Sequence, residues 1–116
     1  MTVNEYLEAN SKRYPNSNHP CNREAIVCAD GMTLSVQASS THYCTPREDD
    51  GPYSSVEVGY PSEAVPELLE YAESPETPTG TIYGYVPVEL VDAAIAAHGG
   101  IVGSRGMAYL EIFGRK

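Results

Sequence analysis

His42 and Cys44 are the residues of this sequence whose types and spacing best suit chemistry at a single site. They lie two positions apart, so their side chains share a face if the segment is extended, and imidazole and thiolate are preferred zinc ligands. A Cys44 nucleophile with His42 or His98 as its base is the other option. No Cys-x-x-Cys pair accompanies them, and Cys21 or Cys28 would have to complete a metal site. We therefore expect free thiols, no metal, no other cofactor and no catalytic residues.

Carboxylates are the second unusual group. Between Arg47 and Arg105 the sequence has eleven acidic side chains and no Lys or Arg. They are Glu48, Asp49, Asp50, Glu57, Glu63, Glu67, Glu70, Glu73, Glu76, Glu89 and Asp92. Helix dipoles explain Glu89 and Asp92, because both lie near the start of an expected helix, where negative charge is stabilising. The remaining acidic residues need another explanation.

The spacing of Glu63, Glu67 and Glu70 is unfavourable for stability. At positions i, i+4 and i+7 of an α-helix, like charges cost about 0.2–0.5 kcal/mol per pair. Glu70 and Glu73 also approach the negative C-terminal end of that helix. We therefore expect a partner-binding acidic surface, and the alternative is a solvated face that only favours solubility. The expected surface consists of Glu48, Asp49, Asp50, Glu63, Glu67, Glu70, Tyr71 and Glu73.

The charge balance of the whole chain indicates the kind of partner. Sixteen acidic and seven basic side chains give a net charge of −9. Nucleic acid and anionic membranes would repel such a chain, so we expect no direct contact with either and favour a basic protein surface. Carboxylates interleaved with tyrosines can occupy a groove built for nucleic-acid phosphates, as a DNA mimic does. The tyrosines concerned are Tyr53, Tyr60, Tyr71, Tyr83 and Tyr85.

These residues must be positioned by a single small domain. Residues 1–116 are expected to form one α+β domain, with about three helices packed on a mainly antiparallel sheet of four to five strands. Thr2 and Glu5 form a capping-box pattern before a first helix, and Asp30-Gly31 is typical of a hairpin turn. The expected elements are a helix at 3–13, strands at 25–29, 32–38 and 55–60, a helix at 65–72, a strand at 82–86, a helix at 87–98 and a strand at 107–113. Gly99 is expected to end the third helix, and 99–106 to form a glycine-rich turn.

The N-terminus gives an expectation about location. It carries carboxylates where a signal peptide needs basic residues, and no apolar run approaches the roughly 20 residues that span a bilayer. We expect the protein in the cytoplasm.

Three stretches of the chain resemble small proteins encoded by phages and other mobile elements. They are residues 35–47 (SVQASSTHYCTPR), 51–61 (GPYSSVEVGYP) and 83–91 (YGYVPVELV). Small acidic phage proteins include many inhibitors of bacterial defence, and anti-CRISPR proteins are similar to this chain in size, charge and lack of motifs. The resemblance implies an inhibitor that acts in a host bacterial cell on a CRISPR effector subunit or nuclease. It supplies no catalytic or ligand motif.

Two other functions remain as alternatives. One is a small enzyme or metal-binding protein centred on His42 and Cys44. The other is a structural or assembly module of a phage particle, in which the tyrosine-rich sheet forms the contact.

Overall fold

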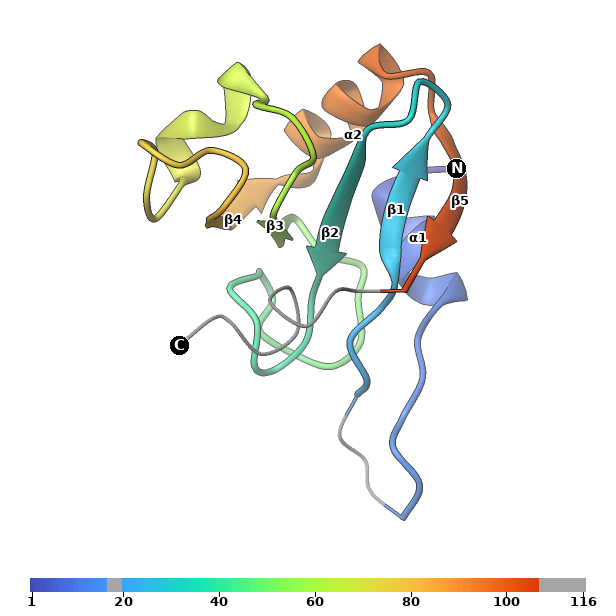
Figure 1. The fold of residues 1–116 in the computed structure, drawn as a ribbon. Coiled ribbons are helices and arrows are strands. Elements are labelled where there is room, and N and C mark those ends of the chain that lie inside the picture. The colour runs from blue at the N-terminus through green and yellow to red at the C-terminus, as the bar shows by residue number, and fades with distance from the viewer. Residues whose placement is uncertain (17–19, 107–116) are drawn as a thin grey trace.

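The computed structural model describes residues 1–16 and 20–106 of the chain. Within these residues, five strands form one antiparallel sheet in the order β4-β3-β2-β1-β5 (Figure 1). The elements are α1 (Val3–Ala9), β1 (Ala25–Cys28), β2 (Thr33–Gln37), β3 (Ser55–Gly59), the 3₁₀ helix η1 (Pro66–Tyr71), β4 (Ile82–Pro87), α2 (Val88–Ala97) and β5 (Ile101–Arg105). The predicted α+β class, with a mainly antiparallel sheet and three helices, is confirmed.

The first helix begins where the sequence predicts. Thr2 Oγ1 accepts from the Glu5 N–H at 3.1 Å, and Glu5 Oε1 accepts from the Thr2 N–H at 2.7 Å, so the capping box is formed. The helix ends at Ala9 rather than at 13, with Asn10 as its C-cap. The Asn10 side chain donates to the Tyr6 carbonyl at 2.9 Å, and such a side-chain bond to the backbone favours a helix end over continuation.

The core lies between the sheet and the two α-helices. In the β1–β2 hairpin, Ile26 is paired with Leu34, and Gly31 in the turn has a positive φ of 95°. Both α1 and α2 lie behind the sheet in the view of Figure 1, and α2 carries the chain from β4 at one edge to β5 at the other. Buried side chains of α1 and α2 join those of the strands in one apolar cluster.

Two predicted elements differ from the structure. The segment expected as an α-helix from Val65 is the 3₁₀ helix η1, which ends when the Ala72 N–H donates to the Leu69 carbonyl at 3.1 Å. The turn predicted at 99–106 is wrong beyond Gly100, because 101–105 forms β5 on the free edge of β1. The strand predicted at 107–113 lies outside the described residues.

The described helices also bear on membrane insertion. Across 1–16 and 20–106, none is long and apolar enough to cross a bilayer.

Candidate functional site

The η1 segment carries two of the predicted acidic residues on an outer edge of the molecule, and a third follows just beyond its end. A 3₁₀ helix has three residues per turn, so Glu67 and Glu70 lie on the same side. Glu73 comes after the extended C-cap residue Ala72, beyond the end of the helix. All three side chains are exposed, while Leu68 between them is fully buried. Figure 1 shows η1 beyond β4, at the end of the sheet opposite β5. We call Glu67, Glu70 and Glu73 the η1 acidic row.

The η1 acidic row has no compensating cation. In the described parts of the chain, no Lys, Arg or His forms an ion pair with any of its members. Glu63 is not part of this row, because η1 begins only at Pro66 and is not α-helical. The predicted α-helical row of Glu63, Glu67 and Glu70 is therefore not formed.

The predicted loop residues 48–50 lie elsewhere. Asp50 pairs with Arg13 at 3.4 Å, and Asp49 Oδ1 accepts from the Ser40 N–H at 2.9 Å. With α1, this loop lines a pocket of about 370 Å³ whose walls include Glu5 and Glu8. Figure 1 shows the loop and η1 well apart. The predicted acidic surface is thus divided into two regions.

The tyrosines differ widely in exposure. Tyr53 and Tyr83 are 4% and 0% exposed, and their hydroxyls donate to backbone carbonyls, so neither can contact a partner. Tyr60 and Tyr71 are half-buried, and Tyr71 packs against the core. Tyr85 is 48% exposed, and its ring centroid lies 5.8 Å from that of Tyr43.

The Tyr43 ring of this pair also contacts a cation. The Arg47 guanidinium lies 5.5 Å from the centroid of the Tyr43 ring, within the range of a cation–π contact. Tyr85 reaches the surface from a bulge in β4, where its φ is 53° and its N–H donates to the Tyr43 carbonyl at 3.0 Å. Sequence reasoning missed this surface, because no local pattern places Tyr43 beside β4.

Two other carboxylates have structural roles. Glu57 is only 3% exposed, and its Oε1 accepts from the Tyr43 N–H at 3.0 Å. Asp92 accepts from the Val3 N–H at 2.8 Å and so joins α2 to the start of α1. These two residues belong to the packing rather than to an open acidic surface.

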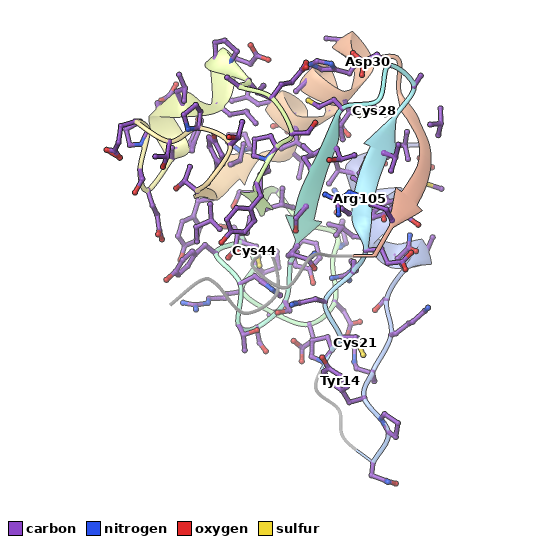
Figure 2. All side chains as sticks on the ribbon, viewed as in Figure 1. Tyr14, Cys21, Cys28, Asp30, Cys44 and Arg105 are labelled. Atoms are coloured by element: carbon purple, nitrogen blue, oxygen red, sulfur yellow. The ribbon has the colours of Figure 1, made fainter. Side chains whose placement is uncertain are left out.

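His42 and Cys44 are both buried and bonded locally. His42 Nδ1 lies 2.6 Å from Ser39 Oγ, and the Cys44 thiol donates to the Ser39 carbonyl at 3.2 Å. Burial raises the pKa of Cys44 and that of Cys28, which favours the neutral thiol over the thiolate that binds zinc. Figure 2 shows Cys21, Cys28 and Cys44 in separate parts of the molecule, and all three are free. The arrangement does not favour a cysteine-based metal or catalytic site.

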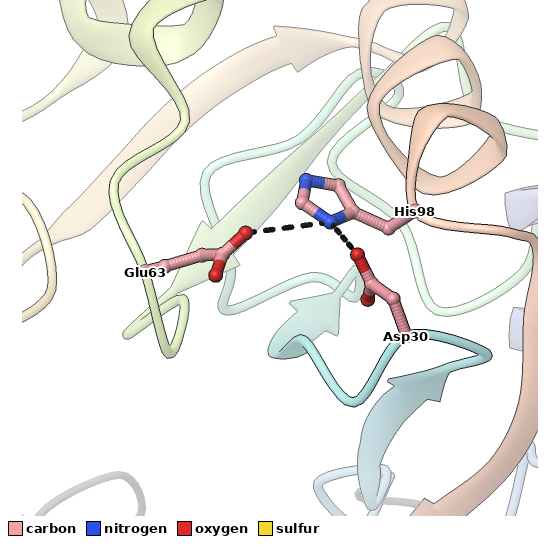
Figure 3. Close-up of side chains that lie close together, drawn as sticks. All are labelled: Asp30, Glu63 and His98. Carbon is pink, nitrogen blue, oxygen red and sulfur yellow. Dashed lines mark hydrogen bonds and ion pairs between the residues drawn. The ribbon is translucent and has the colours of Figure 1, made fainter.

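A different group of metal-ligating side chains does converge. Asp30, Glu63 and His98 point toward one another from three segments (Figure 3). His98 Nδ1 lies 2.6 Å from Asp30 Oδ2 and 3.4 Å from Glu63 Oε1. Two hydrogen bonds lower the pKa of Asp30. The larger effect comes from the Met32 N–H and the smaller one from the His98 side chain. Of the His, Cys, Asp and Glu residues that the structure describes, only these form a group of three with ligand atoms within 4.8 Å of one another.

Comparison with known proteins gives no relative. No protein family model, no curated protein and no solved structure matches the chain.

Proposed function

We propose that the protein is a non-enzymatic inhibitor that binds a basic, nucleic-acid-binding surface of another protein. The observation that supports this proposal is the η1 acidic row, whose three carboxylates are exposed and unpaired within the described residues. One turn of a 3₁₀ helix rises about 6 Å, so Glu67 and Glu70 present two acceptors along one line. Lys or Arg side chains of a partner can satisfy them with charge-assisted hydrogen bonds.

Tyr85 adds an apolar contact to this electrostatic one. Tyrosine and arginine are enriched among the residues that contribute most to protein interfaces, and Tyr85 and Arg47 both lie beside Tyr43. The row sets the charge preference and the association rate, since complementary charges steer encounter. Tyr85 contributes buried area once the complex has formed.

The partner class follows from charge and from the resemblance to mobile-element proteins. A net charge of −9 favours a surface that normally holds phosphates. We propose a CRISPR effector subunit or nuclease of the host bacterial cytoplasm, with the protein acting as an anti-CRISPR inhibitor. It excludes nucleic acid by occupying its groove, so it needs no catalytic residue.

Competition with DNA tests this proposal. Purified CRISPR effector complexes are mixed with target duplex, and DNA binding and cleavage are measured at increasing concentrations of the protein. Wild type should displace DNA from one effector class, and Glu67→Lys/Glu70→Lys should lose at least tenfold in inhibitory potency. Glu24→Lys/Glu89→Lys changes the net charge equally at exposed positions outside the row and serves as the matched control.

Three results would count against the proposal. The first is that no effector class is inhibited by wild type. The second is that the row variant inhibits as well as wild type. The third is that the control variant loses as much potency as the row variant, since bulk charge alone would then explain the effect.

A further inference from the structure

We propose that Asp30, Glu63 and His98 bind one divalent transition-metal ion, with His98 Nδ1 and one oxygen from each carboxylate as ligands. One neutral imidazole and two carboxylates form an N,O ligand set that suits Zn²⁺, Mn²⁺, Co²⁺ or Ni²⁺. The site is separate from the η1 acidic row and does not depend on the inhibitor function.

The distances between the ligand atoms are close to those that an ion requires. In a tetrahedral zinc site with bonds of about 2.1 Å, ligand atoms lie about 3.4 Å apart. His98 Nδ1 and Glu63 Oε1 are already 3.4 Å apart. The contact between His98 Nδ1 and Asp30 Oδ2 is 2.6 Å, so it has to open by roughly 0.8 Å when the ion replaces the shared proton. The Asp30 and Glu63 oxygens lie within 4.8 Å of each other, so they have to close by no more than roughly 1.4 Å. Side-chain rotations can supply both changes.

Backbone hydrogen bonds hold two of the ligand-bearing segments together. The Asp30 N–H donates to the His98 carbonyl at 3.2 Å, and the Ala29 N–H donates to the Gly100 carbonyl at 3.0 Å. Gly99 and Gly100 donate to the Ala96 and Ile95 carbonyls, which is a Schellman end to α2 that sets the direction of His98. The hairpin turn and the end of α2 thus present Asp30 and His98 from one rigid unit.

Hydrogen bonds also hold the segment that carries Glu63 and orient the Asp30 carboxylate. The Ser62 N–H donates to the Thr33 carbonyl at 2.8 Å, which ties the segment carrying Glu63 to β2. Asp30 Oδ1 accepts from the Met32 N–H at 3.0 Å, so its other oxygen, Oδ2, points to His98. Outer contacts of this kind orient the ligands of protein metal sites.

Charge provides the driving force. A neutral imidazole has a single N–H, so His98 Nδ1 cannot donate fully to both carboxylates. No Lys or Arg within residues 1–16 or 20–106 forms an ion pair with Asp30 or Glu63. The C-terminal end of α2 adds partial negative charge beside them. A divalent cation neutralises the two carboxylates together, whereas a protonated His98 supplies only one positive charge.

Calorimetric titration of the chelator-treated full chain with ZnCl₂ tests the site. We expect one Zn²⁺ per chain, and at least tenfold weaker binding after His98→Ala or Glu63→Gln. Glu76→Gln removes an exposed carboxylate outside both the metal site and the η1 acidic row, and Cys21→Ser removes the one cysteine that is not buried, so both should bind Zn²⁺ like wild type. Asp30→Asn preserves the shape of the turn residue, and it should also lose affinity.

The fold should persist in each variant, because all three ligands are at least partly exposed. Circular dichroism of each variant checks this. The proposal is overturned if wild type binds none of Zn²⁺, Mn²⁺, Co²⁺ and Ni²⁺ stoichiometrically. It is also overturned if Zn²⁺ binds with the same affinity after His98→Ala and Glu63→Gln, since the ion would then be held elsewhere.

Discussion

Reversing one charge in the η1 acidic row should stabilise the protein. Glu67 and Glu70 are three residues apart in a 3₁₀ helix, which places them about 6 Å apart along its axis. In water, two like charges at that distance repel by about 0.7 kcal/mol, which screening at 0.1 M salt reduces to about 0.4 kcal/mol. Glu70→Lys converts this repulsion into an equal attraction. We therefore expect a gain of roughly 0.8 kcal/mol in the free energy of unfolding at that ionic strength.

The salt dependence identifies the cause of the gain. With Debye lengths of about 30 Å at 0.01 M and 3 Å at 1 M, the same reasoning gives gains of roughly 1.1 and 0.2 kcal/mol. Urea unfolding followed by far-UV circular dichroism measures the gain, because urea leaves the ionic strength unchanged. Glu89→Lys is the matched control, since it makes the same charge change in the first turn of α2, where losing an acid should destabilise by about 0.3–1 kcal/mol.

A loss of stability in Glu70→Lys, or a gain that does not vary with salt, would show that repulsion between Glu67 and Glu70 does not destabilise the protein. Such a cost in stability is consistent with a binding surface, because proteins commonly keep functional residues that destabilise the fold.

Three further predictions concern the core, the thiols and the first helix. Leu68→Ala removes the fully buried side chain that anchors η1, so it should lower the free energy of unfolding by about 2–5 kcal/mol in urea titrations, and a loss well below this would place Leu68 outside the core. Ellman's reagent should react with Cys21 in the folded protein but with Cys28 and Cys44 only on unfolding, because burial excludes the reagent and raises the pKa of both; three equally fast thiols would contradict their burial. Hydrogen bonds to Thr2 lower the pKa of Glu5, the bond from the backbone N–H more than that of the side chain. The ionised Glu5 carboxylate therefore stabilises the folded protein above its unfolded-state pKa, and this stabilisation is lost as pH falls through its folded-state pKa. Urea midpoints measured across that acidic range should therefore fall less steeply for Glu5→Gln than for wild type, and identical slopes would contradict the capping contribution.

Local chemistry made several elements predictable from the sequence. The capping box at Thr2, the Asp30-Gly31 hairpin and the Gly99 end of α2 each depend on a few neighbouring residues, and each is present. The α+β class followed from these elements. The length of the first helix was overestimated, because the hydrogen bond from Asn10 to the Tyr6 carbonyl leaves no mark in a hydrophobic pattern.

The elements that the sequence did not reveal depend on longer-range contacts. Leu68, Leu69 and Ala72 have spacings that suit an α-helix, but η1 ends at Tyr71. Ala72 then forms a bridge with Tyr83, and the Glu73 N–H donates to the Ile82 carbonyl at 3.0 Å, so the chain pairs with β4 instead of continuing a helix. The glycine-containing segment 101–105 is extended only because β1 offers it a free edge. Tertiary pairing therefore overrode local propensity in both segments.

The candidate sites likewise combine features visible in the sequence with contacts that only the fold creates. The acidic composition was visible at once, but its separation into the η1 acidic row and the loop 48–50 required the fold. Asp30 and His98 are 68 positions apart, so their contact could not be read from spacing. The sequence shows only that Asp30 and His98 each precede a glycine at a chain reversal, Gly31 and Gly99. The pairing of β1 with β5 brings these two reversals together.

The most direct test of the account is the dissociation constant of the complex with an inhibited CRISPR effector, measured by biolayer interferometry for three proteins in the same buffer. We predict that wild type and Glu24→Lys/Glu89→Lys bind within a factor of about three of each other, a difference below 1 kcal/mol. Glu67→Lys/Glu70→Lys should bind at least tenfold more weakly, and wild type should associate more slowly as salt rises. Equal affinity of the row variant and wild type would contradict the claim that the η1 acidic row is the binding surface.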